Sequence, residues 1–504
     1  MDVKGMGVNG VGVNGVGVKE ALPRSTPEDQ GIPSRAVLDF VTALEERVDA
    51  IHGFVLVRHG HVVAQGSWAP YPLNGPRMVF SLSKSFTSSA VGLAVDQRLL
   101  SVDDPVLKFF PDDAPEEVSE NLARMRVRHL LTMTTGHAAD TAVVRTTGDQ
   151  NWVRGILAKP VEHEPGTHFL YNSGASYLLS AIVQQVTGST LLDYLRPRLL
   201  EPLGITDATW QTCPRGINTG GWGLTLRVGE IARFGQLYLQ QGRWNGEQVI
   251  PQEWVAEATS RQVSNDGEPE IDWRQGYGYQ FWRCRNGAYR GDGAFGQYCL
   301  VMPDQDAVLA MIGGTTHMQG ALDLVWEHLL PAMGAEPLPS DDTTRDRLER
   351  RLATLSLPEP SGRSTSPTAA RVSGQTYRVR IGDHSAEDPV LALRLPVRAA
   401  QTIRFDVGAE GECRLRLRDS GGEHEVVGGA NQWRAGTTTV VRDDPDPVLV
   451  RATWTDDDTC ELRICFVRTP FIRTHALKFE GDQVTMTTVD NVLPPPAAVV
   501  ADLG

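Results

Sequence analysis

Residues 80–100, FSLSKSFTSSAVGLAVDQRLL, contain the most informative pattern in this chain of 504 residues. Apolar residues recur after Lys84 at helical spacing, which predicts a buried helix from about Ser81 to Leu99. Residues three apart share one face of a helix, so Ser81 and Lys84 can touch. A serine hydroxyl needs a base within hydrogen-bonding reach, and a partly buried lysine with a lowered pKa can be that base. The stretch therefore predicts a reactive serine–lysine pair.

The composition, with 41% hydrophobic and 22% charged residues, is typical of a soluble globular protein. The length exceeds one ordinary core, so we expect two domains. The net charge of −14 repels phosphate groups, and we expect no nucleic-acid partner and no membrane binding. The start lacks the pattern of a signal peptide, and no apolar run approaches the roughly 20 residues of a membrane span, which predicts a cytoplasmic location.

The chain changes character several times along its length. A five-residue repeat opens it, LPEPSGRSTSP has the composition of a linker, and a regular alternation of apolar and polar residues begins near residue 376. These changes predict a disordered Gly/Val tail at 1–22, a first folded domain at 23–332, a linker with a short helix at 333–375, an all-β barrel at 376–494 and a loose tail at 495–504.

In the first domain, strand patterns occur at both ends and helical patterns lie between them. This order predicts an α/β (α+β) fold with one antiparallel sheet and flanking helices. The expected strands are two within 53–68, followed by 277–284, 286–291, 297–302 and 306–313. The expected helices are 34–48, 127–134, 174–187, 228–241 and 251–260.

A second motif can complete a site around the serine–lysine pair. Tyr171 directly precedes a strongly apolar predicted helix, and a tyrosine there can relay a proton between nucleophile and leaving group. Ser173 can place another hydroxyl beside Lys84 or the substrate carbonyl. Taken alone, Tyr171 reads more readily as a half-buried core residue, so its assignment depends on the other motifs.

A third motif is Gly291-Asp292-Gly293-Ala294, with Gln297 close behind it. Glycines in an edge strand let a ligand carbonyl approach closely. A backbone N–H from this segment and that of Ser81 can together form an oxyanion hole, which stabilises a tetrahedral intermediate. We therefore assign Asp292, Gly293, Ala294 and Gln297 to substrate and oxyanion binding.

With these motifs in view, residues 23–332 resemble the serine beta-lactamase-related family. The resemblance lies in FSLSKSFTSSAVGLAVDQRLLSVDDPV, RHLLTMTTGH, EPGTHFLYNSGASYLLSAIVQQVTG, EPLGI and GDGAFGQYCLVMPDQDAVLAM. That family contains class C beta-lactamases, DD-peptidases, family VIII esterases and 6-aminohexanoate-dimer hydrolases. The resemblance implies a beta-lactamase/transpeptidase-like fold in which Ser81 is acylated, Lys84 is its partner and Tyr171 is the second base. The strand pattern after 376 is similar to the lipocalin-like barrels appended to some members.

Two motifs depart from the pattern of that family. The usual Tyr-x-Asn is Tyr171-x-Ser173 here, and neither Lys-Thr-Gly nor His-x-Gly appears, so that Gly291-Asp292-Gly293 is the nearest match. An aspartate at this place would repel a substrate carboxylate. The departure argues against penicillin hydrolysis and favours esters or small amides.

Other patterns carry less weight. The GxGxxG matches lie in the repeat tail without the strand and helix of a dinucleotide site, and His163-Glu-Pro-Gly-Thr-His168 lacks the helix of a zinc protease. His137 can line a cleft, although a structural role fits better. The same holds for an aromatic cluster that can form an acyl pocket or pack in the core: Trp273, Tyr277, Tyr279, Phe281 and Trp282. Scattered cysteines predict reduced, partly buried thiols: Cys213, Cys284, Cys299, Cys413, Cys460 and Cys465.

These observations predict a serine hydrolase that cleaves a small-molecule ester or amide through a Ser81 acyl-enzyme, with no metal and no organic cofactor. Two alternatives stay open. In one, an amine or alcohol replaces water, which makes the protein an acyltransferase or a peptide-releasing enzyme. In the other, the fold is a non-catalytic binding protein, which predicts a broken Ser–Lys–Tyr set. The sequence leaves open whether the chain forms a homo-oligomer.

Overall fold

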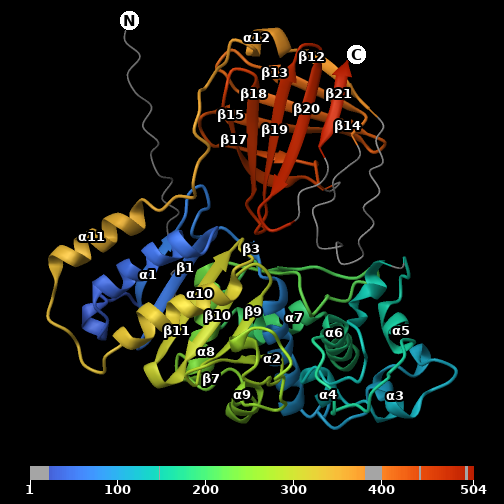
Figure 1. The fold of residues 1–504 in the computed structure, drawn as a ribbon. Helices are drawn as coiled ribbons and strands as arrows, with labels where there is room; N and C mark the ends of the chain where they lie inside the picture. Colours follow the sequence, from blue (N-terminus) through green and yellow to red (C-terminus); the bar gives the residue numbers. More distant parts are fainter. Residues whose placement is uncertain (1–21, 147, 381–399, 442–443, 494–497) are drawn as a thin grey trace, which may run out of the picture.

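The computed structural model describes residues 22–146, 148–380, 400–441, 444–493 and 498–504. A mixed α/β domain carries a β-barrel at one end, and the barrel stands directly above the short strand β3 (Arg77–Met78) in Figure 1. The predicted fold class, a beta-lactamase/transpeptidase-like α/β domain followed by an all-β barrel, is confirmed. The predicted tail at 1–22 lies outside the described residues except for its last residue.

The central sheet of the first domain is antiparallel, with strand order β2-β1-β11-β10-β9-β8. Its first two strands come from the start of the domain and the others from its end, as the sequence pattern predicts. The strands are β1 (Ile51–Arg58), β2 (His61–Ser67), β8 (Trp282–Arg283), β9 (Tyr289–Gly293), β10 (Gln297–Met302) and β11 (Ala307–Gly313).

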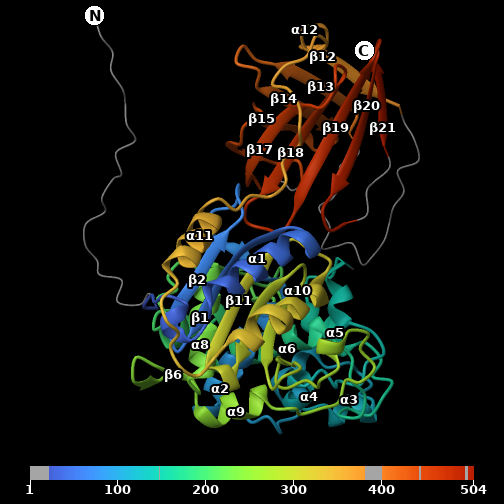
Figure 2. The ribbon, with the colours of Figure 1, turned by 60° about the vertical axis from the view of Figure 1, so that its left-hand side comes forward.

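Helices cover both faces of this sheet. In β1 every residue is buried, because successive side chains point to opposite faces and each face has its own core. Phe54 and Leu56 pack with α1 (Ser34–Arg47) and α10 (Met318–Leu324), which lie together on one side of the sheet in Figure 2. Val55 and Val57 belong to the core that contains α2 (Ser83–Asp96), α6 (Ser173–Thr187) and α8 (Val228–Leu239).

The remaining α-helices surround these layers, except for α12, which packs against the barrel core. They are α3 (Glu120–Arg124), α4 (Val127–Leu131), α5 (Trp152–Leu157), α7 (Leu191–Leu195), α9 (Gln252–Thr259), α11 (Asp342–Ala353) and α12 (Ala369–Val372). α11 lies in the segment predicted as a linker with a short helix.

Two strand predictions near the site are wrong in their bounds. Only Trp282–Arg283 of the expected strand 277–284 is extended in the sheet, because Gln280 has a φ of 64° and interrupts any continuous strand. The next strand begins at Tyr289 rather than 286, because Asn286 and Gly287 form a turn with positive φ. Both errors arise where a left-handed residue stands inside an otherwise strand-like pattern.

Ten strands form the second sheet of the described residues, and nine of them make up a closed barrel whose side chains mostly alternate between interior and solvent, while β16 pairs only with β17 outside the ring. β15 and β17 also pair with each other, and this pairing closes the sheet. The strands are β12 (Gln375–Val379), β13 (Thr402–Val407), β14 (Cys413–Asp419), β15 (Gly422–Ala430), β16 (Arg434–Thr438), β17 (Asp446–Trp454), β18 (Thr459–Phe466), β19 (Ile472–Glu480), β20 (Gln483–Asp490) and β21 (Val499–Leu503).

The last strand corrects the expected tail at 495–504. β21 pairs with both β12 and β20, so the end of the chain is part of the barrel wall. Its sequence, VVADL, follows a proline run and is short, whereas its partner β12 lies more than a hundred residues earlier. One of its two partners, β20, is the preceding strand of the described chain, and the other, β12, lies far away in sequence.

All six cysteines are buried and free of disulfides, and Cys460 Sγ lies 3.7 Å from Cys413 Sγ. Within the described residues, no helix combines the length and apolar character needed to cross a membrane. The predicted location stays a prediction.

We expect the barrel to depend on β21. Ala501 is fully buried, and Ala501→Asp would place an unpaired charge in the barrel interior at a cost of roughly 3 kcal/mol or more. The matched control is Leu503→Asp on the same strand, where the side chain is 40% exposed and the expected change stays within about 0.5 kcal/mol. Differential scanning calorimetry measures both, and equal melting temperatures for the two variants would contradict the assignment of this strand.

Candidate active site

Ser81 lies in a 3-10 turn (Phe80–Leu82) that leads directly into α2. The predicted helix therefore begins two residues later than expected, because Ser83 bonds the Phe80 carbonyl through both its N–H and its hydroxyl and closes the tighter turn. Lys84 lies one turn further on, with its Nζ 3.0 Å from Ser81 Oγ. Ser81 is partly exposed while Lys84 is only 1% exposed, so a substrate can reach the serine but not the lysine.

Lys84 is held by neutral oxygens. Its Nζ donates to Gly221 O at 2.8 Å and to Ser173 Oγ at 3.2 Å, in addition to Ser81. Burial lowers the pKa of Lys84 to about 8; the charges of Asp140 and Asp292 counter this in part, and Arg145 adds to it. A neutral amine keeps two hydrogens for Gly221 and Ser173 and presents its lone pair to the serine hydroxyl. Lys84 can therefore act as the base.

Tyr171 closes the other side of the pair. Its ring centroid lies 4.7 Å from Lys84 Nζ, and the ring stacks on Trp282 with centroids 5.2 Å apart. Burial raises the pKa of Tyr171 far above its ordinary value, the charge of Asp292 adds to this, and a hydrogen bond with Ser81 offsets only part of it. The side chain therefore stays a phenol near neutral pH and is suited to pass a proton rather than to hold a negative charge.

Two residues that the sequence analysis did not single out, Asn172 and Asp140, hold the start of α6, where Ser173 lies. Asn172 is fully buried and caps the helix by accepting a hydrogen bond from Gly174 N at 3.0 Å. Asp140 accepts from Ser173 N at 2.9 Å. The first is detectable as an N-cap before an apolar run, whereas Asp140 lies in a distant loop with no local signal. Together they fix the turn that holds Tyr171 and Ser173 at Lys84.

The end of β9 lies against the backbone of the serine turn. Gly293 approaches so closely that a Cβ atom on it would lie 2.1 Å from Val79 O, so no side chain is tolerated. Ala294 follows Gly293 and lines the cleft together with Ser81. Within the described part of the chain, the N–H groups of Ser81 and Ala294 donate to no protein acceptor. Both are available to a substrate oxygen.

Asp292 faces the cleft but does not carry a free charge. Arg290 donates from Nε to Asp292 Oδ2 at 2.9 Å, and the Trp282 indole also bonds this carboxylate. Arg290 is itself fully buried, with its guanidinium carbon 4.1 Å from the centroid of the Trp273 ring. Burial raises the pKa of Asp292, and Arg290 opposes this rise. The pair is a locally neutral wall of the site.

Gln297 does not contact the cleft, although the sequence suggested a role in binding. Its side chain is 2% exposed and donates from Nε2 to Gly313 O at 2.8 Å and to Ala294 O at 3.1 Å. It therefore orients the peptide group of Ala294 from behind. The sequence around Gln297 contains no feature that distinguishes substrate binding from support of the Ala294 peptide group.

The cleft at Ser81 has a volume of about 400 Å³. It divides the predicted aromatic cluster, since Trp273 and Trp282 line it while the other three members are buried in the core. Glu268 and Glu270 contribute acidic groups to its rim. His137 is buried and bonds Thr135 Oγ1 at 2.9 Å, which agrees with a structural role.

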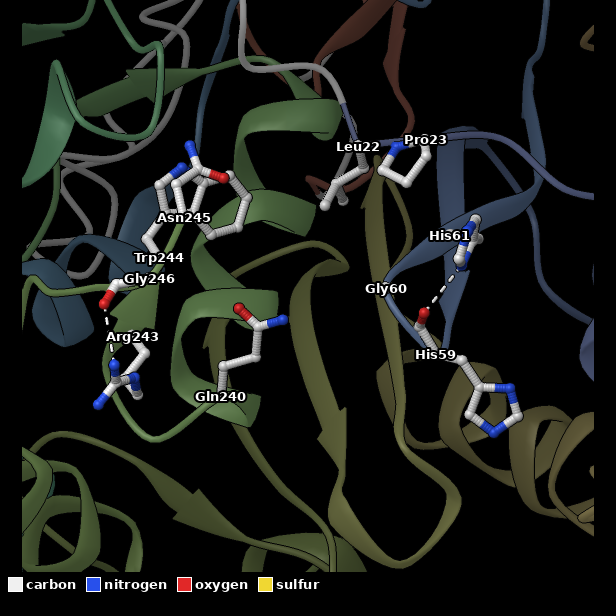
Figure 3. Close-up of a pocket in the computed structure, with 10 residues that line it drawn as sticks. All are labelled: Leu22, Pro23, His59, Gly60, His61, Gln240, Arg243, Trp244, Asn245 and Gly246. Atoms are coloured by element: carbon white, nitrogen blue, oxygen red, sulfur yellow. Dashed lines mark hydrogen bonds between the residues drawn. The ribbon is translucent and has the colours of Figure 1, made fainter.

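A second hollow, of about 550 Å³, lies where the turn between β1 and β2 faces the segment after α8 (Figure 3). It shares no lining residue with the Ser81 cleft. The rings of His163 and His168 lie 4.5 Å apart, and the described residues contain no cluster of three or more ligands arranged for a metal ion. The absence of a metal requirement stays a prediction.

Comparison with known proteins agrees with this geometry. A family model described as Beta-lactamase matches residues 41–328, more than half of the chain. The chain belongs to the beta-lactamase family. The family match ends before the barrel begins, and it includes every residue of the cleft described above.

Relatives within the beta-lactamase family include hydrolases and acyltransferases. The chain is 24% identical to a 6-aminohexanoate-dimer hydrolase of Paenarthrobacter ureafaciens over 59% of its own length and 82% of that protein. It is 24% identical to a monacolin J acid methylbutanoyltransferase of Aspergillus terreus over 28% and 40%. A solved structure from Bacillus anthracis, provisionally named a 6-aminohexanoate-dimer hydrolase, is 20% identical over 63% and 89%, with a TM-score of 0.50.

The lowered pKa of Lys84 predicts the pH dependence of acylation. Only the neutral amine accepts the serine proton, so the rate should rise about tenfold per pH unit below pH 8 and level off above it. Asp140→Asn removes a negative charge that raises this pKa, and the midpoint should move to lower pH. Rapid-quench mixing followed by intact-protein mass measures acylation, and a flat profile from pH 6 to pH 10 would contradict Lys84 as the base.

Proposed function

We propose that the protein hydrolyses esters or small amides of neutral or cationic molecules through a covalent Ser81 acyl-enzyme. The observation that carries this proposal is the 3.0 Å contact between a partly exposed serine hydroxyl and a buried lysine whose pKa lies near 8. The family relationship supports an acyl-transfer reaction, and Tyr171 beside the pair supports a complete Ser–Lys–Tyr set.

In the first half of the reaction, Ser81 Oγ attacks the substrate carbonyl while its proton passes to Lys84 Nζ. The carbonyl oxygen becomes an oxyanion, and the N–H groups of Ser81 and Ala294 stabilise it. The bond from the carbonyl carbon to the leaving group then breaks, and the proton returns from Lys84 through the Tyr171 phenol to that group. An acyl group remains on Ser81.

In the second half, water takes the place of the leaving group. Its proton passes through Tyr171 to Lys84 as its oxygen attacks the acyl carbon, and Ser81 regains a proton when the acid product departs. An amine or alcohol acceptor would follow the same path and give a transferase. The relative named as a methylbutanoyltransferase keeps that alternative open.

The charge of the cleft supports the choice of substrate. Glu268 and Glu270 stand at its rim, Arg290 compensates the charge of Asp292 in its wall, and its lining contains no lysine, arginine or histidine. Burial raises the pKa of Glu268, and within the described chain no ion pair or hydrogen bond involves its carboxylate. An anionic substrate such as a penicillin would meet repulsion here, whereas a neutral or cationic ester would not.

The acyl-enzyme itself is tested with a short-chain p-nitrophenyl ester. We expect a mass increase equal to the acyl group in the native chain and none in Ser81→Ala. Tyr171→Phe keeps the ring but removes the proton relay, and turnover should fall by about 10² to 10⁴. Product analysis with added amines and alcohols separates hydrolysis from transfer. An acyl adduct that persists in Ser81→Ala would contradict the proposal. If the native protein forms no adduct with ester, amide or beta-lactam substrates, the binding-protein alternative is favoured.

Substrate charge is tested with three esters that differ only in an ammonium, a neutral or a carboxylate group at the acyl terminus. The native protein should have the lowest kcat/KM for the carboxylate. In Glu268→Gln, the ratio of kcat/KM for the neutral ester to kcat/KM for the carboxylate ester should fall about fivefold, as expected for the loss of one partly screened charge. Glu253→Gln in α9, exposed and outside the cleft, is the control and should change nothing. Equal ratios in native protein and Glu268→Gln would contradict charge selection by this residue.

A further inference from the structure

We propose that the β-barrel is a working part of the catalytic centre, in which Phe471 is a positioning residue for the oxyanion hole. The inference rests on the proposed function, because it assigns Phe471 a role in the chemistry of Ser81. Phe471 lies in the loop between β18 and β19, which contacts the α/β domain through the hydrogen bond from Met78 N to Arg468 O.

The two N–H groups assigned to the oxyanion hole each adjoin a residue in an unfavourable conformation. Phe80, directly before Ser81, has a φ of 47°, and Phe295, directly after Ala294, has a φ of 69°. Residues other than glycine rarely adopt positive φ, and such backbone persists only where its surroundings hold it. Each strained residue therefore needs a support. The Ser81 N–H lies in the peptide group that it shares with Phe80, and Phe295 is the next residue after Ala294, so both residues constrain the segments that carry the two N–H groups.

Phe471 supplies one support for both residues. The ring centroids of Phe80 and Phe295 lie 5.6 Å apart, and Phe471 packs on each of them, at 6.2 Å from Phe80 and 5.7 Å from Phe295. All three contacts have the edge-to-face geometry that aromatic rings favour. Phe80 is 3% exposed and belongs to the hydrophobic core of the barrel rather than to either core of the α/β domain.

Hydrogen bonds hold the loop of Phe471 at a fixed position. Met78 N donates to Arg468 O at 2.9 Å, which joins β3 to the barrel two residues before Phe80. On the other side, Asn491 Nδ2 donates to Gly314 O at 2.8 Å and to Pro470 O at 3.0 Å. The barrel is therefore anchored to the backbone on both sides of the aromatic trio formed by Phe80, Phe295 and Phe471.

The loop itself is internally bonded. Phe466 N donates to Phe471 O at 3.1 Å, and Phe471 N donates to Thr469 Oγ1 at 3.3 Å. A rigid loop transmits the position of the barrel to the rings of Phe80 and Phe295. If the ring of Phe471 is lost, both strained residues can relax, and the N–H groups of Ser81 and Ala294 move away from their common target.

The test is Phe471→Leu in the full chain, compared with Phe479→Leu. Phe479 is 1% exposed in the same barrel core and packs on Phe405 and Trp454 but not on Phe80, so both variants lose the same atoms from one core. We expect acylation by a p-nitrophenyl ester to fall roughly 10- to 100-fold in Phe471→Leu, as for a small misplacement of catalytic groups. Phe479→Leu should acylate at the native rate.

Three readouts distinguish positioning from simple destabilisation. An alkyl boronic acid forms a tetrahedral adduct with the serine, and its affinity should fall in parallel with acylation in Phe471→Leu. KM should change less than kcat, and the pH midpoint set by Lys84 should stay in place. If Phe471→Leu does not accumulate as folded protein, Phe471→Met has about the same volume but is unbranched and adapts to irregular space, and it should show the same pattern.

Equal acylation rates and boronate affinities in Phe471→Leu and Phe479→Leu would overturn the inference, as would a decrease that appears only in KM. Ser81→Ala is measured beside them. If Ser81→Ala retains the adduct, the proposed function fails; if it loses the adduct while Phe471→Leu matches Phe479→Leu, the function stands and only the role of the barrel is refuted.

Discussion

The desolvation of Lys84 is the interaction on which the rest of the site depends. A lysine in water is protonated at neutral pH and cannot take a proton from serine. Here the three oxygens bonded to Nζ are all uncharged, and Asp140 and Asp292 are close enough to raise the pKa without an ion pair to the amine among the described residues. A carboxylate in direct contact would restore the proton and remove the base. The site therefore requires that Asp140 and Asp292 lie near Lys84 without direct contact to its Nζ.

This requirement explains why three elements begin or end at one point. The 3-10 turn and the start of α2 bring Ser81 and Lys84, the segment that leads into α6 brings Tyr171 and Ser173, and β9 brings the wall that contains Asp292. Gly221 and Gly293 allow backbone to lie where side chains would otherwise stand. Arg290 compensates Asp292 inside the protein, between tryptophans, and so keeps its charge from controlling Lys84.

The sequence predicted those parts of this arrangement that have a local period or a local motif. The antiparallel sheet, the helices that cover it, the alternating strands of the barrel and the proximity of Ser81 and Lys84 follow from spacing, and the place of Ser173 beside Lys84 was suggested by its motif. Residues that act through distant partners left no such signal. Asp140 bonds a helix start more than thirty residues away, and β21 pairs with the distant β12 as well as with the preceding β20. Gln297 is the opposite case. Its position next to the third motif suggested that it lines the cleft, whereas its side chain bonds the backbone carbonyls of Ala294 and Gly313.

The phenol of Tyr171 has a consequence for the choice between water and another acceptor. Because the group stays neutral, it treats the departing and the incoming oxygen or nitrogen alike, giving a proton in one direction and taking it in the other. The Ser–Lys–Tyr set therefore does not distinguish hydrolysis from transfer. That distinction must come from the walls of the cleft, where Trp273 and Trp282 offer an apolar surface to an acceptor and the acidic rim attracts an amine. In the proposed reaction, reaction class and substrate class therefore depend on the same few side chains around the cleft, outside the Ser–Lys–Tyr set.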